Sequence, residues 1–257
     1  MAGFEVNCQK VDYSPPEQAE IKILSGTTLS VKSGEFVGIV GGNGTGKSTL
    51  LQAIAGEIEI TDGSIKVAGQ YIDGPIHNRI DGVGIVHQHD DEDLLHAYSV
   101  LTNIAFRQAN NNCHPNKFWA CGLTYRTAIA AKLGGFGLNT DVNTLVGHLS
   151  GGMRQMLNLV IAIHLEHVHS PCSLILLDEH TSKLDHTNST KLMEFTNTQI
   201  RRTGATAIMV THRYSDVIKY CDRIVVMGGG GTIKNEFEKS KGFPTVEALA
   251  LAVEEAS

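Results

Sequence analysis

Short apolar runs alternate with longer amphipathic stretches along most of this 257-residue chain. Phe36–Val40, Ser173–Leu177 and Ala205–Thr211 are rich in aliphatic residues, which is typical of buried strands. Apolar residues at helical spacing follow the first two runs, over Ser48–Ala55 and Thr187–Arg201. Strands that alternate with helices in this way predict an α/β fold with a largely parallel sheet.

The pattern differs near the N-terminus, where polar and apolar residues alternate over Glu20–Leu24 and Thr27–Val31. Residues 63–74 add another strand pair, with turn residues at Asp62-Gly63 and between the strands at Ala68-Gly69-Gln70. We expect these strands to form an antiparallel β subdomain that leads into Phe36–Val40. The other predicted elements are the strand Gly84–His87, the hairpin of Arg223–Met227 with Thr232–Phe237, and a final helix that opens at Pro244.

Helical patterns dominate residues 89–164, with predicted helices at Val100–Gln108, Tyr125–Leu133 and from Leu149 to His164. We expect this region to be a helical subdomain inserted into the α/β core. The chain is then a single domain of residues 1–257, with its core formed by 1–88 and 165–257. The acidic run Asp90–Asp93 fits a solvated loop, and also a docking edge for a basic partner.

Composition narrows the function classes. The net charge of -6 argues against nucleic acid as the main partner and is ordinary for solubility. Five cysteines without a C-x-x-C pair indicate free thiols in a reducing cytosol. The start lacks a signal-peptide core, and the apolar stretches are too short to span a bilayer. We expect the chain to reach a membrane only through another subunit.

The segment between the first buried strand and its helix fits the phosphate-loop pattern G-x-x-x-x-G-K-[ST]. Its glycines let the backbone bend around phosphate groups, and the lysine places a charge on them. The first hydroxyl after the lysine can bind Mg²⁺, and the second faces the α-phosphate. The predicted nucleotide ligands are Gly41, Gly42, Asn43, Gly44, Thr45, Gly46, Lys47, Ser48 and Thr49, with Ser48 on the metal.

Two carboxylates, Asp178 and Glu179, end the apolar strand at Leu177. A carboxylate at a strand end beside a phosphate loop can hold Mg²⁺ through water. A second carboxylate can polarise the attacking water as a general base. The pair therefore predicts nucleotide hydrolysis and not only nucleotide binding.

The segment Leu149–Gln155, LSGGMRQ, places Met153 in a string otherwise identical to LSGGQRQ. Together with the phosphate loop, the aspartate–glutamate strand and a later strand that ends at His212, this order resembles the ATP-binding subunits of ABC transporters. The resemblance extends from about Phe4 to about Glu255. It implies a P-loop NTPase core of RecA type, with a mainly parallel sheet, an antiparallel β subdomain and an inserted helical subdomain.

The resemblance also implies roles for residues outside the loop. Tyr13 matches the aromatic residue that stacks on adenine, although plain sheet packing would explain it equally. Gln88 matches the glutamine that senses Mg²⁺ and the γ-phosphate, and His212 matches the histidine that contacts the γ-phosphate. The remaining implied positions are Asp178 on the magnesium, Glu179 as catalytic base, Ser150, Gly151 and Gly152 on the γ-phosphate of the opposite subunit, and Asp185 in the loop between the two sites.

A two-site mechanism follows from the resemblance. Each ATP, with Mg²⁺, would lie between one subunit's phosphate loop and the other's LSGG segment in a homodimer or pseudo-dimer. The expected partners are an integral membrane permease and a substrate-binding protein, with no nucleic acid. The chain would be cytoplasmic and peripheral on the inner face of the cell membrane. Lys183 departs from the alanine usual in the S-A-L-D loop.

The string Asp178-Glu179-His180-Thr181 resembles a narrower bacterial group associated with tryptophan or tyrosine uptake, which favours an importer. An exporter or lipoprotein-release ATPase and a soluble cluster-assembly ATPase remain alternatives. The imidazoles of His164, His167 and His169 could suggest a metal site. Since only the first two share a helical face, a solvated helix end is the favoured interpretation.

Overall fold

The computed structural model describes residues 3–17, 20–72, 81–89, 93–110, 123–165 and 172–256. The chain forms two compact units. The core unit comprises residues 1–85, 173–179 and 200–257, and the helical unit comprises 86–172 and 180–199. The predicted organisation as a single domain, with core residues 1–88 and 165–257 and helical residues 89–164, stays a prediction.

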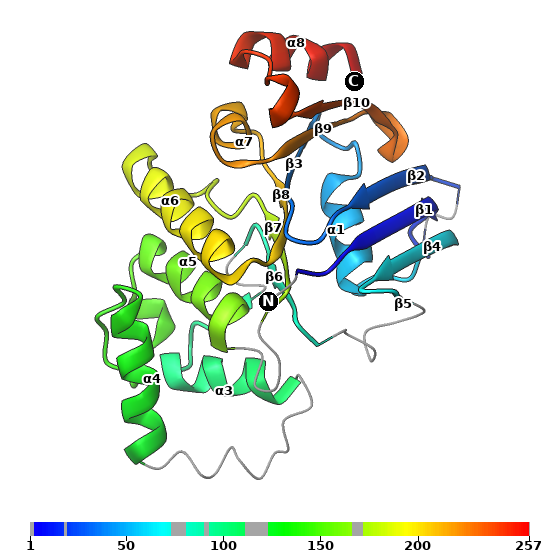
Figure 1. Ribbon diagram of the computed structural model, residues 1–257. Coiled ribbons are helices and arrows are strands. Elements are labelled where there is room, and N and C mark those ends of the chain that lie inside the picture. The colour runs from blue at the N-terminus through cyan, green and yellow to red at the C-terminus, as the bar shows by residue number, and fades with distance from the viewer. Residues whose placement is uncertain are drawn as a thin grey trace. The chain divides into compact units, whose positions relative to one another are not determined.

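A six-stranded sheet forms the centre of the core unit, in the order β10-β9-β3-β8-β7-β6 (Figure 1). Strand β3 pairs in parallel with both β8 and β9, and β7 pairs in parallel with β8, whereas β10 is antiparallel to β9. All residues of β3, β7 and β8 are buried, as their apolar sequences predict. The strands are β3 (Phe36–Gly41), β6 (Val83–Val86), β7 (Leu174–Asp178), β8 (Thr206–Val210), β9 (Arg223–Met227) and β10 (Ile233–Glu238).

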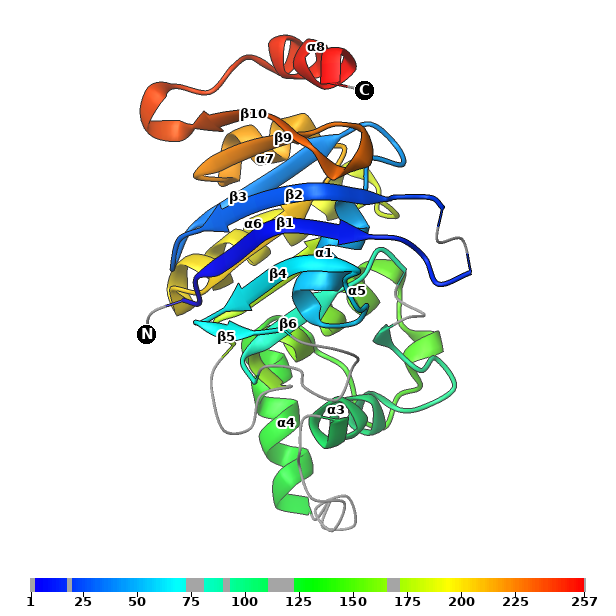
Figure 2. The ribbon, with the colours of Figure 1, turned by 90° about the vertical axis from the view of Figure 1, so that its right-hand side faces the viewer.

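A second, antiparallel sheet in the order β2-β1-β4-β5 confirms the predicted β subdomain (Figure 2). Helix α1 (Lys47–Ala55) lies between the two sheets, and all three share one apolar core. The predicted strand at Glu20–Leu24 is wrong, because β2 begins only at Leu24. The strands of this sheet are β1 (Val6–Tyr13), β2 (Leu24–Val31), β4 (Asp62–Val67) and β5 (Gln70–Tyr71).

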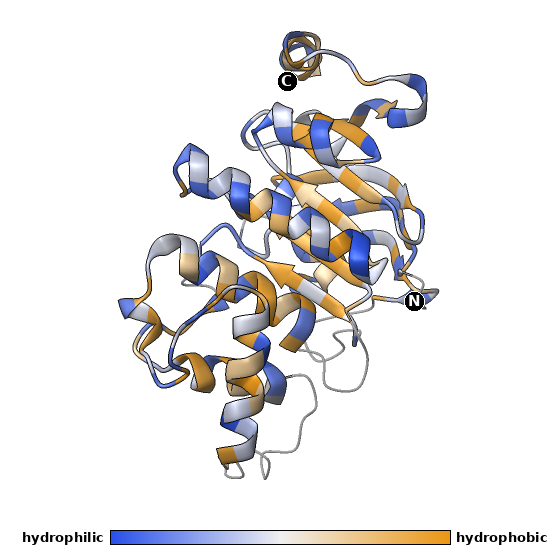
Figure 3. Cartoon of the chain, turned by 60° about the vertical axis from the view of Figure 1, so that its left-hand side comes forward, coloured by the Kyte–Doolittle hydropathy of each residue, from blue (hydrophilic) through white to orange (hydrophobic). Residues whose placement is uncertain are grey.

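Helices α7 (Tyr214–Tyr220) and α8 (Val246–Ala256) belong to the core unit, and α8 packs on α7, β9 and β3. Helix α6 (His186–Thr203) runs from the helical unit into the core unit. Figure 3 shows that the central strands are the most uniformly apolar elements of the core unit. The sequence did not predict α7, whose seven residues are too few for a clear helical period.

The helical unit contains α3 (Val100–Asn110), α4 (Leu123–Gly135) and α5 (Gly151–Val160) around a separate apolar core. These helices confirm the three predicted ones. The predicted continuation of the third helix to His164 is a π-helical turn over Ile161–Leu165. Of the acidic run, residues 90–92 lie outside the described residues, and Asp93 is buried.

Candidate functional site

The predicted phosphate loop connects the end of β3 at Gly41 to the start of α1 at Lys47. Gly44 and Gly46 have φ angles of 76° and 91°, a conformation that favours glycine. Gly41 has no room for a side chain, because a Cβ atom there would lie 2.2 Å from the Met227 carbonyl oxygen. The loop therefore holds the sharply bent backbone that an anion-binding turn before a helix requires.

The Lys47 side chain folds back over this loop. Its Nζ atom donates hydrogen bonds to the carbonyl oxygens of Gly41 at 3.0 Å and Gly42 at 2.7 Å. Burial lowers the pKa of Lys47, and the nearby charges of Glu179 and Asp178 oppose that shift. Phosphate oxygens are stronger acceptors than carbonyls, so an incoming phosphate group can draw the ammonium group away from the loop.

A cavity of about 280 Å³ opens over the loop, entirely within the core unit. Glu179 and His212, which are far apart in sequence, both line it. Ile23 lines it too, and the sequence did not mark this residue because it lies in the loop before β2. The predicted loop residues in the lining are Asn43, Gly44, Gly46, Lys47, Ser48 and Thr49.

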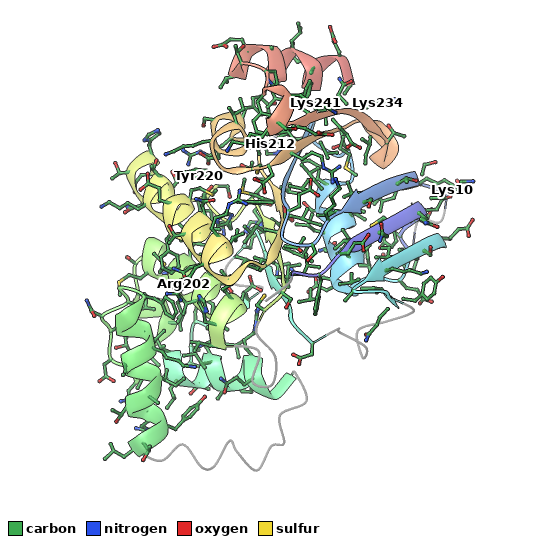
Figure 4. The ribbon with its side chains drawn as sticks, viewed as in Figure 1. Lys10, Arg202, His212, Tyr220, Lys234 and Lys241 are labelled. Atoms are coloured by element: carbon green, nitrogen blue, oxygen red, sulfur yellow. The ribbon has the colours of Figure 1, made fainter. Side chains whose placement is uncertain are left out.

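Glu179 and His212 are in direct contact, with His212 Nε2 at 2.8 Å from Glu179 Oε1. Strands β7 and β8 are parallel neighbours, so the residues that follow them meet at one edge of the sheet. Figure 4 labels His212 in its place after β8. Glu179 has a φ angle of 45°, a left-handed conformation rarely adopted by a residue with a side chain. Backbone strain of this kind is concentrated at functional sites.

Asp178 is buried at the last position of β7. Its charge acts on Lys47, as does that of Glu179. The structure thus brings Lys47, Ser48, Asp178, Glu179 and His212 into one corner of the core unit. Tyr13 is half-buried against the apolar core and is not among the residues that line the cavity. Its role in stacking on adenine stays a prediction.

Five other predicted positions, Gln88, Ser150, Gly151, Gly152 and Asp185, lie in the helical unit. Ser150 caps α5, and its Oγ atom accepts a hydrogen bond from the Met153 amide at 3.3 Å. At Gly151 and Gly152 an added Cβ atom would meet no atom within 4 Å, so this helix start borders open space. Gln88 is half-buried just after β6.

Asp185 is the N-cap of α6. Its Oδ1 atom accepts hydrogen bonds from the backbone amides of Thr187 and Asn188, both at 3.0 Å. Its Oδ2 atom accepts a third from Asn188 Nδ2 at 2.6 Å. The carboxylate is therefore committed to the start of the helix, and any role between two sites would act through this turn.

Of the three neighbouring histidines, for which a solvated helix end is the favoured interpretation, the structure describes only His164, and its ring is packed. The His164 ring stacks on Phe136 with centroids 4.5 Å apart, and its Nε2 atom lies 3.0 Å from Gln199 Oε1. His167 and His169 lie outside the described residues. Among the residues that are described, no group of three histidine, cysteine or carboxylate side chains could hold a metal ion. None of the described helices is long and apolar enough to cross a membrane.

Solved structures share the fold. The protein cbiO1 from Clostridium perfringens, part of the ABC transporter complex cbiONQ, superposes with a TM-score of 0.73 at 24% identity, covering 97% of this chain and 94% of that one. A dimeric ATP-binding cassette in a post-hydrolysis state, with ADP and phosphate bound, gives 0.74 at 24% identity, covering 91% and 98%. At these identities the likeness shows the fold.

Sequence relatives show the family. The ABC transporter family model matches residues 24–182. The tyrosine transport ATP-binding protein of Clostridioides difficile is 31% identical over 88% of this chain and 89% of its own length. The energy-coupling factor transporter ATP-binding protein EcfA2 of Acetivibrio thermocellus is 30% identical over 91% and 80%. The chain therefore belongs to the ABC transporter family, as a subunit that binds and hydrolyses ATP.

Proposed function

We propose that this chain drives import of a small solute, of the amino acid class, through a separate membrane permease. The observation that carries the proposal is the cavity over the phosphate loop, which Lys47 lines together with the Glu179–His212 pair. The relative named for tyrosine transport supports the amino acid class, as do relatives named for methionine import, which are 28–31% identical.

The loop and its neighbours would hold the nucleotide. Backbone amides of Gly44–Thr49 face the phosphates, and Lys47 exchanges its loop carbonyls for the β- and γ-phosphate oxygens. Tyr13 would stack on the adenine, with Ile23 in the adjacent wall of the cavity.

The donor set at the loop fits Mg²⁺, which prefers oxygen ligands and retains several waters. The Ser48 hydroxyl and the Asp178 carboxylate of the core unit provide such oxygens, and the amide oxygen of Gln88 is the third ligand that we assign to the ion. When bound, the ion would neutralise charge on the phosphates.

Glu179 would accept the proton of the attacking water, which approaches the γ-phosphate in line with the leaving oxygen. His212 contacts that carboxylate at 2.8 Å and fixes its direction. For His212 to donate this hydrogen bond, Nε2 carries the proton, so Nδ1 is the acceptor in the neutral ring. The strained backbone at Glu179 places its side chain in the cavity instead of along the strand.

The second half of the site would come from another copy of the chain. Ser150, Gly151 and Gly152 lie at a helix start that borders open space, where backbone amides can reach an anion. In the closed dimer they would contact the γ-phosphate held by the partner, and hydrolysis would reopen the pair. Closing and reopening of the dimer would change the conformation of the permease, which spans the membrane. The permease would also bind the dimer at the inner face of the membrane, and a substrate-binding protein would act on the outer side.

Phosphate release from Mg²⁺-ATP tests the proposed hydrolysis. Glu179→Gln removes the proton acceptor and keeps the size and shape of the side chain. Turnover should therefore fall about a hundredfold or more, and the variant should form a stable dimer in the presence of ATP. Glu194→Gln is the matched control, because Glu194 is exposed on α6 and should leave turnover unchanged. Full turnover in Glu179→Gln would remove Glu179 from its role, and recovery with soluble scaffold proteins instead of a permease would contradict transport.

A further inference from the structure

A buried carboxylate in the helical unit has no part in the chemistry described so far. The Asp93 side chain is fully buried and accepts four hydrogen bonds. His87 donates two, from its backbone amide at 2.8 Å and from Nδ1 at 2.7 Å. Arg107 Nη1 donates a third at 2.9 Å, and Asn158 Nδ2 a fourth at 2.6 Å.

These donors come from three separate parts of the helical unit. His87 immediately precedes Gln88, Arg107 is on α3, and Asn158 is on α5. Helix α5 is the one whose first turn carries Ser150 and the two glycines. One carboxylate therefore joins the segment of Gln88 to the helix of the LSGG motif.

Helix α3 also binds the residues that follow Asp93, at a second point. Asn103 lies one helical turn before Arg107 and is almost completely buried. Its Oδ1 atom accepts from the Leu95 amide at 2.6 Å, and its Nδ2 atom donates to the carbonyl oxygens of Leu95 and Ser99, both at 3.0 Å. Two anchors one turn apart fix the direction of the segment that follows Asp93, as well as its position.

The carboxylate is charged at neutral pH. Burial by itself would raise the pKa of Asp93, but the hydrogen bond from His87, the charge of Arg107 and the amide of Asn158 lower it to about 2. A buried charge that loses one partner is strongly unfavourable, whereas an apolar replacement of the whole cluster would be tolerated. Such a cluster therefore specifies one arrangement of its three elements more than it adds stability.

We propose that Asp93 is a positioning residue for ATP hydrolysis, which fixes Gln88 to the helix that presents Ser150, Gly151 and Gly152. Gln88 would then approach the nucleotide of its own subunit, and the LSGG segment the nucleotide held by the partner, as parts of one rigid body. This inference rests on the proposed function, because it assigns Asp93 an effect only through Gln88 and the helix start. Nucleotide capture by the phosphate loop, which belongs to the core unit, would not depend on it.

The test compares Asp93→Asn with Asp141→Asn, the same change at an exposed carboxylate of the same unit. Turnover with Mg²⁺-ATP should fall about tenfold or more in Asp93→Asn, because a small displacement of a positioned group is costly in rate. The apparent Kd for a fluorescent ATP analogue should change less than about twofold, since the loop is intact. Asp141→Asn should match wild type in both measurements.

Arg107 provides a second pair of variants should Asp93→Asn fail to fold. Arg107→Gln should lower turnover at unchanged nucleotide affinity, and Arg107→Lys should restore part of it by keeping the charge beside Asp93. A purely structural role would lower the folded fraction and leave turnover per folded molecule unchanged. Wild-type turnover per folded molecule in both Asp93→Asn and Arg107→Gln would overturn the proposal.

Gln88→Ala and Glu179→Gln, measured in parallel, separate this inference from the function on which it rests. Both should lose turnover if the proposed function holds. If both hydrolyse ATP like wild type, the proposed function fails, and the assignment of Asp93 fails with it. If both lose turnover while Asp93→Asn and Arg107→Gln keep it, only the assignment of Asp93 fails.

Discussion

Single side chains in this protein are held in states that an isolated residue would not adopt. Glu179 has a left-handed backbone, and Lys47 is folded onto the carbonyls of its own loop. The sequence predicts both residues from their motifs, but it cannot predict these conformations. They arise because β7 and β8 end side by side and because Lys47, at the start of α1, is buried against the loop carbonyls.

His180, next to Glu179, is a histidine whose protonation state is determined by its packing. The ring is buried, and its Nε2 atom lies 3.2 Å from Thr196 Oγ1. That hydroxyl donates its own proton to the Leu192 carbonyl oxygen at 2.8 Å, so it accepts from the ring. His180 is therefore neutral with the proton on Nε2, and burial lowers its pKa to about 4.

This burial makes stability depend on pH. The unfolded chain binds a proton below about pH 6.5, and the folded protein does so only near pH 4, so acid favours unfolding. We expect the free energy of unfolding of the nucleotide-free protein to fall by about 2 kcal/mol from this group between pH 7 and pH 5. Urea unfolding at the two pH values measures it.

The variant His180→Gln should lack this loss, because it keeps an amide donor that does not titrate in this range. His148→Gln, at an exposed histidine of the same unit, should retain the full loss. Equal pH dependence in His180→Gln and wild type would show that the buried ring does not control acid stability.

At the scale of elements, close packing of β3 on α7 sets the start of the phosphate loop. Gly38 faces Val217 and Cys221 across this contact, where an added Cβ atom would lie 2.5 Å from Val217 Cγ1 and 3.0 Å from Cys221 Sγ. Both neighbours are fully buried, so moving either one would disturb the packing around it. The glycine therefore allows α7 to approach the strand that ends at Gly41.

We expect Gly38→Ala to lower the free energy of unfolding by about 1–3 kcal/mol through overpacking. Denaturant unfolding measures this change, and the dependence of the free energy of unfolding on denaturant concentration should stay the same. Gly135→Ala is the control, because no atom lies within 4 Å of its added Cβ and alanine favours the helix. A stability of Gly38→Ala equal to wild type would show that β3 and α7 have room to separate.

The predictability of elements follows their length and their neighbours. Long periodic helices and apolar strands, such as α3 and β7, could be predicted from sequence alone. The short helix α7 and the start of β2 could not, because packing on β3 and pairing with β1 decide them. The same limit applies to the site, where motifs identify Glu179 and His212, but Ile23 and Asp93 take their places only through tertiary contacts.

At the scale of the whole molecule, the proposed site is divided between two copies. The core unit provides the phosphate loop with Glu179 and His212, and the helical unit provides the helix start at Ser150. A dimer related by twofold symmetry would complete two such sites at once. Two variants that each inactivate one half should then complement each other.

Mixing Lys47→Ala with Gly151→Asp tests this division directly. The first variant lacks the phosphate-binding charge, and the second places a carboxylate where the γ-phosphate would lie, at a position with space for a side chain. Each variant alone should be inactive. Random mixing gives about half mixed dimers with one intact site of two, so about a quarter of wild-type phosphate release should return.

The control mixture combines Lys47→Ala with the double variant Lys47→Ala/Gly151→Asp, which leaves no intact site in any dimer and should stay inactive. Recovery of activity only in the first mixture is the result that the account predicts. Two inactive variants that stay inactive when mixed, although an affinity tag on one variant retains the untagged other variant in ATP, would contradict a site shared between two copies.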